Sequence, residues 1–507
     1  MVSSSTSTSL RLLVESLGKN ARRMGRADEG LLEAGYWEPA KPTPSPSLLT
    51  YAQVLFQFVR PSFLSKAGPR STKLRRTAYL DGLRGFAALL VYFGHHELWA
   101  HKAQHADQIL ENAFGYETRY YMVTLPGVRT FFSGGHLAVS CFFVISGYVL
   151  SAKPLALIQS GDRAAFSDNI SSALFRRWLR LYLPVICTTF LTFSMWHAFG
   201  VLANFQPQRN FRDELWNWYI EFKSFSFIFR LGGEPWLSYN FHVWSIPEEF
   251  KGSVVIYTAL VSFSKCTRTA RLWGETALVY YFMWIVDGAH MSMFMVGMLL
   301  CDLDLLAIGD DLPLWLKRLK PYNAYFFPCL FALGILLGGC PAFSWDIQVL
   351  RSSPGWRHIS FLVPQAVFDY KWFFLFWAAT FVVASAPRLP CLKRFFESRF
   401  CLYLGRISFA FYLVHGPILW TLGDRLYAAT GWTQESHALG IPDWVNKFPL
   451  PRWGPFGMEI SFLLPHLILL PVTLWMAEIA TTLFDEPSIK FSSWIYRKVT
   501  KSEPGKL

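Results

Sequence analysis

The sequence predicts an all-α protein, a bundle of helices that crosses a membrane about ten times. Hydrophobic residues make up 52% of its 507 positions, and charged residues make up only 16%. The mean hydropathy is +0.25. Apolar runs of helix-spanning length recur along the chain, separated by polar segments. The short alternating segments of a membrane β-barrel are not seen in the sequence.

Residues 1–75 are predicted to form a polar, largely disordered tail, rich in Ser, Arg and Pro. An apolar stretch at 48–59 is short, which favours an interfacial helix over a membrane span. Basic residues at 73–76 then precede the first apolar run. The positive-inside bias therefore predicts a cytosolic N-terminus.

The following apolar segments form the predicted transmembrane domain, residues 76–490, and residues 491–507 form a cytosolic tail. Two segments beside Asp287-Gly288 are too short to cross alone, and we expect a broken helix or a hairpin there. Basic segments between the spans fall on the same side as the N-terminus, as the positive-inside bias requires. The predicted spans are 80–99, 134–152, 181–203, 241–264, 275–287, 289–301, 323–340, 370–387, 402–424 and 458–482.

Charge and cysteine content exclude some classes of function. The net charge is +13, but Lys and Arg lie in short segments beside apolar runs, which is typical of topology signals and not of nucleic-acid binding. The eight cysteines show neither a paired metal spacing nor a disulfide framework. The sequence therefore predicts no metal site and no tightly bound cofactor.

The first polar constellation lies in the first span. Asp81, Arg84 and His95 fall on one stripe of a helix, with His95 about 16 Å deeper than Arg84. Histidine is the usual general base near neutral pH, so the stripe indicates a reaction site. Two alternatives stay open: Arg84 as a topology anchor, and His95 as a packed, hydrogen-bonded histidine. His96 competes as the base but points about 100° away.

A second constellation lies in the segment from His242 to Phe250. In a helix, His242, Ser245 and Glu249 share one face. A carboxylate near an imidazole would hold its tautomer and stabilise the imidazolium ion. The alternative is that Glu249 pairs with a nearby basic residue, which lowers the cost of inserting it into the membrane.

A third constellation comprises Arg176, Arg177 and Arg180, just before a predicted span. Guanidinium groups match phosphate oxygens, so these residues fit a polyphosphate or a nucleotide at the cytosolic membrane edge. The alternative is contact with lipid headgroups and topology signalling.

Two further segments place polar groups within apolar helices. Ser408, Tyr412 and His415 share a helical face, and they either line a site or hydrogen-bond a neighbouring helix. The step Ser146-Gly147 is typical of close helix packing. Asp485-Glu486, at the end of the last span, is expected to pair with basic residues.

Together the motifs resemble those of the acyltransferase 3 family of integral membrane acyltransferases, in the same order along residues 76–490. The pattern Ile246-Pro247 followed by Glu249-Phe-Lys-Gly resembles the filamentous-fungal branch. Two departures are Glu248 beside Glu249 and His96 beside His95. The matching segments are Leu80–Leu89, Cys141–Tyr148, Arg176–Pro184, Trp244–Glu249, Gly297–Leu300, Gly405–His415 and Glu486-Pro487.

The resemblance implies an acyl-CoA-dependent O-acyltransferase. Acyl-CoA, most often acetyl-CoA, would approach from the cytosol as a co-substrate, and its phosphates would meet arginines. A histidine would take the proton of an acceptor hydroxyl on a small molecule (a secondary metabolite) or a glycan. The implied catalytic residues are His95, Glu249 and Arg84. The implied acyl-CoA- and substrate-binding residues are Asp81, Arg176, Arg177, Arg180, Ser146, Trp244, Ser245, Tyr412 and His415.

Two other classes of function fit parts of the pattern. A transporter could use intramembrane His, Glu and Arg as a relay, although we find no two related halves in the sequence. A receptor or scaffold protein could use the aromatic-rich loop 204–240. We expect an integral protein of an endomembrane or the plasma membrane, with the lipid bilayer as a partner. The sequence predicts no oligomeric state.

Overall fold

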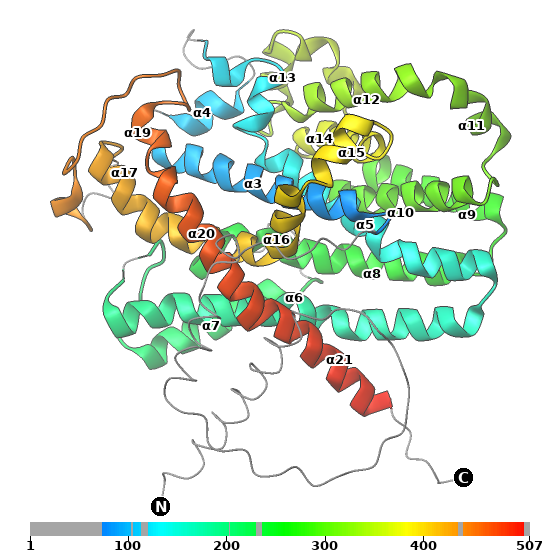
Figure 1. Ribbon diagram of the computed structural model, residues 1–507, viewed down its shortest axis with the longest axis horizontal. Helices are drawn as coiled ribbons and strands as arrows, with labels where there is room; N and C mark the ends of the chain where they lie inside the picture. The colour runs from blue at the N-terminus through cyan, green and yellow to red at the C-terminus, as the bar shows by residue number, and fades with distance from the viewer. Residues whose placement is uncertain are drawn as a thin grey trace, which may run out of the picture. The chain divides into compact units, whose positions relative to one another are not determined.

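The computed structural model describes residues 74–102, 105–112, 120–201, 203–229, 236–433 and 440–500 (Figure 1). All regular elements in these residues are helical, and no strand occurs among them. The predicted all-α class is confirmed. The predicted disordered tail at 1–75 and its interfacial helix lie almost entirely outside the described residues.

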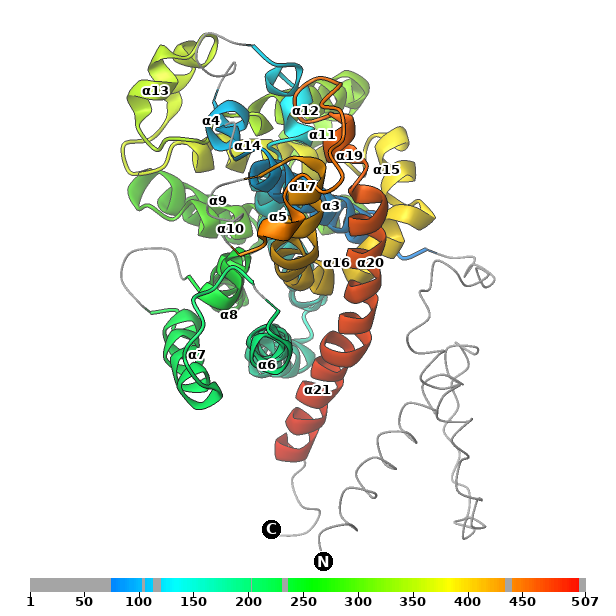
Figure 2. The ribbon, with the colours of Figure 1, turned by 90° about the vertical axis from the view of Figure 1, so that its left-hand side faces the viewer.

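The longer helices form the body of the bundle. α5, α6, α8 and α10 run roughly parallel to one another in Figure 1, and α6 is seen along its axis in Figure 2. The bounds are α3 (Ala78–Ala100), α5 (Gly135–Ser160), α6 (Arg163–Phe199), α7 (Phe211–Ser226), α8 (Ser245–Phe263), α9 (Arg268–Tyr280), α10 (Ala289–Ile308), α12 (Asn323–Gly338), α14 (Lys371–Ser385), α16 (Arg399–Ile418), α20 (His466–Ala480) and α21 (Glu486–Thr500).

Shorter elements connect or extend these helices. A 3₁₀ segment, η5, leads directly into α8, and π-helical turns continue α9, α16 and α20. The bounds are α4 (Ala106–Glu111), α11 (Leu314–Leu319), α13 (Ile347–Ser352), α15 (Pro390–Phe396), α17 (Asp424–Thr430), α19 (Ile460–Leu463), η5 (Ser238–Trp244), η6 (Tyr281–Ile285), η10 (Leu419–Gly423) and η12 (Thr481–Asp485).

Within the described residues, six helices are long and apolar enough to cross a membrane, or seven if α14 and α15, bent by 93°, form one span. The predicted count of about ten is therefore not confirmed. The difference lies in three predicted spans that correspond to α3, α8 and the α9–η6 segment. α3 and α8 carry many of the polar residues singled out from the sequence, and these lower their hydropathy. The segment predicted at 289–301 is longer than expected, because α10 has 20 residues.

The arginine-rich segment lies inside a helix and not before one. α6 has 37 residues, which is about 55 Å of helix and well beyond the thickness of a bilayer core. The side chain of Asp162 caps its first turn by accepting from the backbone of Ala165 at 3.0 Å. The predicted span at 181–203 is thus the second half of a longer helix, and Arg177 lies near its middle.

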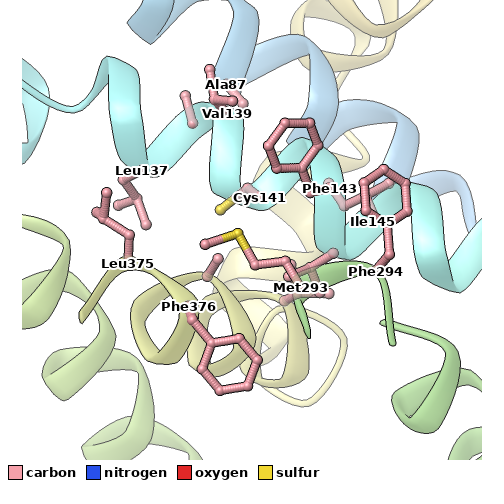
Figure 3. Close-up of a cluster of buried hydrophobic side chains, with 14 of the residues drawn as sticks. Ala87, Leu137, Val139, Cys141, Phe143, Ile145, Met293, Phe294, Leu375 and Phe376 are labelled. Atoms are coloured by element: carbon pink, nitrogen blue, oxygen red, sulfur yellow. The ribbon is translucent and has the colours of Figure 1, made fainter. Parts of the chain in front are cut away.

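α5 occupies the centre of the bundle and contacts α3, α8, α10 and α14. Figure 3 shows apolar side chains of α3, α5, α10 and α14 meeting around Cys141, among them Phe143, Met293 and Phe376. These side chains are almost fully buried. Because α5 is apolar on all faces, it can be covered from several sides at once.

Two helix crossings are so close that only glycine fits. A Cβ on Gly405 of α16 would lie 2.2 Å from the carbonyl oxygen of Asp81 on α3. A Cβ on Gly297 of α10 would lie 2.1 Å from the carbonyl oxygen of Val144 on α5. Such small-residue contacts let membrane helices approach backbone to backbone. They set the spacing of the helices that surround the site.

The last helices form a long continuous element. α20, η12 and α21 follow one another without a break, and α21 packs against α6. Residues 491–500 of the predicted cytosolic tail continue α21 as helix. Asp485 is thereby placed beside the middle of α6.

Candidate active site

A cavity of about 210 Å³ opens between α3, α5, α6, α8, α16 and η12. It brings together seven of the residues predicted to be catalytic or to bind substrate, which come from five separate helices. They are Arg84, Ser146, Arg177, Arg180, Ser245, Glu249 and Tyr412. Three further polar residues, Ser408, Arg406 and Asp485, line the same cavity.

The charges in the cavity are unbalanced. Its described lining holds four guanidinium groups, from Arg84, Arg177, Arg180 and Arg406, and two carboxylates. The surplus of two positive charges favours an anionic ligand. The remaining wall is largely apolar, formed by side chains such as Phe142, Leu150, Ile246 and Phe409. A ligand with a charged end and an apolar arm matches this lining.

Glu249 is held by an arginine of α6. Arg177 donates from Nη2 to Glu249 Oε1 at 2.5 Å and from Nε to Ser253 Oγ at 2.7 Å. The two charged side chains are 11% and 15% exposed. The expected pairing of Glu249 with an imidazole is therefore wrong. Its carboxylate pairs with a basic residue, Arg177, which is the alternative given above. A pair this well shielded fixes the position of both groups in the cavity wall.

Arg84 lies where α3 crosses α16. It donates from Nη2 to the carbonyl oxygen of Gly405 at 3.3 Å, and the same nitrogen lies 3.6 Å from Asp81. Asp81 also pairs with Arg75 at 3.0 Å and is not part of the cavity lining. Asp81 therefore contacts the site through Arg84 and not directly.

Two other predicted binding residues lie outside the cavity lining. Arg176 donates to the backbone of Ser172 at 2.9 Å and to Ser493 of α21 at 3.2 Å. Arg176 shares a helix face with Arg180, but it lies one turn earlier in α6, where its side chain is held by these two contacts. The ring of Trp244 packs against Trp372 with 6.0 Å between centroids. Neither residue is positioned to bind a ligand in this cavity.

Ser245 and Tyr412 form the part of the cavity wall that lies next to His242 and His415. The Tyr412 hydroxyl donates to the carbonyl oxygen of His242, so it accepts from Ser245 Oγ, which lies 2.8 Å away. Tyr412 also places its ring 5.8 Å from that of His415. This part of the cavity wall therefore adjoins a cluster of histidines.

The histidine pair His95–His415 has a defined tautomer. His415 Nδ1 faces the backbone carbonyls of Tyr412 at 2.8 Å and Phe411 at 3.3 Å. Carbonyl oxygens only accept, so Nδ1 carries a proton, and in the neutral ring Nε2 is an acceptor. His95 Nδ1, 2.8 Å from His415 Nε2, must then be the donor. The Nε2 of His95 keeps a lone pair that can take a proton.

A third histidine stacks on this pair. The rings of His242 and His95 lie 3.9 Å apart at 16°, and those of His95 and His415 are parallel within 3°. A nitrogen of each ring lies within 4.8 Å of the others. In-plane lone pairs of stacked, parallel rings do not converge on one point as the ligands of a tetrahedral metal do. The arrangement is that of a hydrogen-bonded stack.

His96, the alternative base, belongs to a separate network. Its Nδ1 lies 2.6 Å from the hydroxyl of Tyr427, which is 3.3 Å from His466 Nε2. His466 Nδ1 in turn lies 2.9 Å from the hydroxyl of Tyr92. His96 is fully buried in this network, whereas His95 faces His415 and His242. His95 and His96, which the sequence left as alternative bases, thus belong to two different hydrogen-bond networks.

Sequence reasoning missed two residues, Arg406 and Asn240. Arg406 stands inside a motif that was recognised, and its charge within an apolar helix was the available signal. Asn240 is in a 3₁₀ segment and donates to the carbonyl oxygen of Leu413 at 2.9 Å. A helix was expected to contain His242, but α8 begins only at Ser245. No periodicity could have revealed the place of Asn240.

Comparison with known proteins gives a consistent result. The family model described as an acyltransferase domain (Acyl_transf_3) matches residues 77–475. The chain is 28% identical over 484 residues to the O-acetyltransferase PaAT-1 of Phomopsis amygdali, covering 88% of this chain and 90% of that protein. It is 22% identical over 424 residues to the acyltransferase clz18 of Cochliobolus lunatus, covering 74% and 88%. No solved structure matches the chain.

Proposed function

The chain belongs to the acyltransferase 3 family, and we propose on that premise that it moves an acetyl group from acetyl-CoA to a hydroxyl of a small molecule or a glycan. That it is an acyltransferase follows from the family model and from the relatives it matches. The observation that carries the proposal is the His95–His415 hydrogen bond of 2.8 Å next to a cationic cavity.

The charge of the cavity supports an acyl-CoA donor. Its guanidinium groups match phosphate oxygens, and its apolar wall suits the uncharged arm that carries the thioester. We propose that the phosphates of the nucleotide end lie near the guanidinium groups of Arg84 and Arg180.

The proposed reaction uses His95 as a general base. Its Nε2 takes the proton of the acceptor hydroxyl while the hydroxyl oxygen attacks the thioester carbonyl carbon. The tetrahedral intermediate collapses as the carbon–sulfur bond breaks, and the protonated His95 returns its proton to the CoA sulfur. His415 holds His95 in the required tautomer throughout. The apolar surroundings exclude water and so limit hydrolysis of the thioester.

The acceptor is proposed to carry a hydroxyl. One relative that the chain matches along most of its length is named an O-acetyltransferase, and a neutral histidine base suits a hydroxyl nucleophile. The alternative of a transporter is not favoured, because the matched relatives are named acyltransferases. We place the protein in an endomembrane or the plasma membrane.

The proposal is tested with purified protein in lipid nanodiscs and radiolabelled acetyl-CoA. The acceptor source is an organic extract of a strain of the source organism that lacks the gene. We expect labelled ester in the extract only with the wild-type protein. Absence of any labelled product and of CoA release, together with label passing intact through proteoliposomes, would overturn the proposal in favour of transport.

A further inference from the structure

A second cavity, of about 660 Å³, opens where several helices end. It lies between the last turns of α5 and α10, the first turns of α6 and α9, and the segment that joins α8 to α9, towards the right of Figure 1. It shares no lining residue with the cavity of the candidate active site. Along α5, Leu157 of the second cavity lies about 10 Å beyond Leu150 of the first. The two cavities are therefore separate.

The lining of the second cavity is rich in basic side chains. Two of its four cations are neutralised within the protein. Arg271 is 4% exposed and binds Asp302 through two nitrogens, at 2.7 and 3.0 Å, and Arg268 pairs with Asp311. The charged residues of the lining are Arg163, Lys265, Arg268, Arg271, Asp162 and Asp311.

Arg163 and Lys265 are the cations that remain. Both are exposed, and among the described residues neither side chain forms an ion pair or a hydrogen bond. The remaining carboxylate, Asp162, accepts from the backbone nitrogen of Ala165 at 3.0 Å, where it caps α6. Two unpaired cations beside one carboxylate leave a surplus of positive charge, which favours an anionic ligand.

The buried part of the lining is mostly apolar. Phe166 and Leu306 are 8% and 4% exposed, and Leu157, Ile158 and Leu305 are half-buried in the same lining. A free inorganic anion gains nothing from an apolar wall, whereas a ligand that joins an anionic group to hydrocarbon uses both parts of the cavity. The volume lies within the range of ligand sites, about 300–1,000 Å³.

The position of the cavity also suits a lipid. Its lining begins a few residues beyond the predicted spans 134–152 and 241–264, which places it at the predicted edge of the bilayer. Phospholipids present their phosphates at this depth, and basic pockets between membrane helices bind such headgroups. A soluble ligand would not need a cavity at the membrane edge.

We propose that the second cavity binds the phosphate group of an anionic phospholipid. Arg163 and Lys265 hold the phosphate, and the beginning of an acyl chain lies against Phe166 and Leu306. Because Arg163 begins α6 and Lys265 follows α8, the bound phosphate joins two segments of the bundle. The site takes no part in the proposed acetyl transfer and does not depend on it.

Alkylation of Cys266 reports whether the site is occupied. Cys266 is exposed and lines the second cavity, whereas Cys391 is exposed on α15, outside the lining. Wild-type protein in detergent is treated briefly with N-ethylmaleimide, and peptide mass spectrometry measures the labelled fraction of both cysteines. The ratio of Cys266 to Cys391 labelling is internal to each sample. A lipid bound in the cavity should lower this ratio, because it covers the Cys266 thiol.

Three probes separate the contribution of the phosphate from that of the hydrocarbon. Dioctanoyl phosphatidic acid carries both, dioctanoyl phosphatidylcholine carries the same chains on a zwitterionic headgroup, and inorganic phosphate is the anion alone. Phosphatidic acid should protect Cys266 at a concentration at least about tenfold lower than either other probe, because only it combines charge-assisted hydrogen bonds with apolar burial.

Two variants assign the phosphate contact. Arg163→Gln and Lys265→Gln should each raise the concentration of phosphatidic acid for half-protection by about three- to tenfold at low salt, and the difference should shrink at high salt. Lys153→Gln is the matched control, because Lys153 is an exposed lysine of α5 that lines neither cavity. Half-protection is measured against the lipid-free rate of the same variant, so an altered reactivity of the Cys266 thiol does not affect it.

Several outcomes would overturn the proposal. Equal protection by inorganic phosphate would make the cavity a site for a free anion, and equal protection by phosphatidylcholine would make it an apolar groove. An effect of Lys153→Gln as large as that of Arg163→Gln would place the phosphate elsewhere on the surface. Absence of protection by all three probes would exclude the site itself. None of these results bears on the proposed function, which turnover of acetyl-CoA tests separately.

Discussion

At the residue scale, the site depends on which atom of each histidine carries its proton. The backbone carbonyls of α16 fix the proton of His415, and His415 in turn fixes that of His95. Among the described residues, no carboxylate takes part in this chain of hydrogen bonds, because Glu249 is bound by Arg177. His95, the proposed base, is thus oriented by a second imidazole.

Removal of His415 should lower turnover more than binding. His415→Phe keeps a ring in the same place but loses the acceptor for His95, so we expect kcat to fall by about 10- to 100-fold with little change in the KM for acetyl-CoA. His415→Gln, which retains an acceptor, should recover part of the loss. Equal activity of the Phe and Gln variants would contradict a role in orienting His95.

Arg180 should contribute to binding of acetyl-CoA, whereas Arg176 should not. Arg180 lines the cavity, and Arg176 is engaged by Ser493. Arg180→Gln should raise the KM for acetyl-CoA about tenfold at low salt, because a charge-assisted hydrogen bond is lost. The difference from wild type should shrink at high salt. Arg176→Gln is the matched control, and an equal effect of both substitutions would count against the assignment.

The sequence predicted which residues lie near the cavity better than it predicted which residues each of them contacts. Helical spacing placed Arg84 and His95 on one face, and an Arg-rich segment predicted a cationic site. It could not tell that Arg177 would face the cavity and Arg176 would not, because that depends on how α6 is rotated against α8 and α21. The position of Asn240 could not be predicted, because its backbone is not α-helical and helical periodicity does not apply to it.

At the element scale, two of the five helices that line the cavity are atypical of a membrane span, whereas α5, α6 and α16 qualify as candidate spans. α3 and α8 do not pass as candidate spans by length and composition, yet α3 contacts α5 and α16, and α8 contacts α5, α6 and α10. Neighbouring helices can shield their polar residues from lipid. Hydropathy alone therefore predicted the class of the fold. The close helix crossings at Gly405 and Gly297 could not be predicted from it, because they depend on which helices pack against each other.

The α3–α16 crossing should not tolerate a larger side chain. Gly405→Val would place its side chain against the backbone of Asp81, 2.2 Å from a Cβ at this position, and should cost about 1–3 kcal/mol or more. Thermal unfolding of the protein in detergent measures this. Gly135→Ala is the control, because a Cβ there has no atom within 4 Å among its described surroundings. Equal melting temperatures of both variants would contradict the described crossing.

At the scale of the whole molecule, the basic residues predict how the bundle is oriented in the membrane. The cavity wall holds four guanidinium groups, and the proposed function requires that acetyl-CoA reach them from the cytosol. The sequence predicts that the basic segments near 265–271 and 393–399 face the cytosol. This orientation remains a prediction of the charge pattern.

Cysteine labelling in sealed vesicles tests that orientation. Cys266 and Cys391 are exposed and lie beside those basic segments, so a membrane-impermeant maleimide should label single-cysteine variants of both from the cytosolic side. Asp443→Cys, at an exposed position between the predicted spans 402–424 and 458–482, lies on the opposite side in the predicted topology and should react only after permeabilisation. The reverse labelling pattern would place the arginines on the wrong side for cytosolic acetyl-CoA.

The most direct test of the proposed mechanism compares two adjacent histidines. Turnover of acetyl-CoA to CoA and labelled ester is measured for His95→Ala and His96→Ala, with thermal unfolding as a check that both proteins fold. General-base catalysis contributes about 10²- to 10⁴-fold, so His95→Ala should lose at least that much of kcat, whereas folded His96→Ala should stay within about tenfold of wild type. Full activity of His95→Ala, or a greater loss in folded His96→Ala, would contradict His95 as the base.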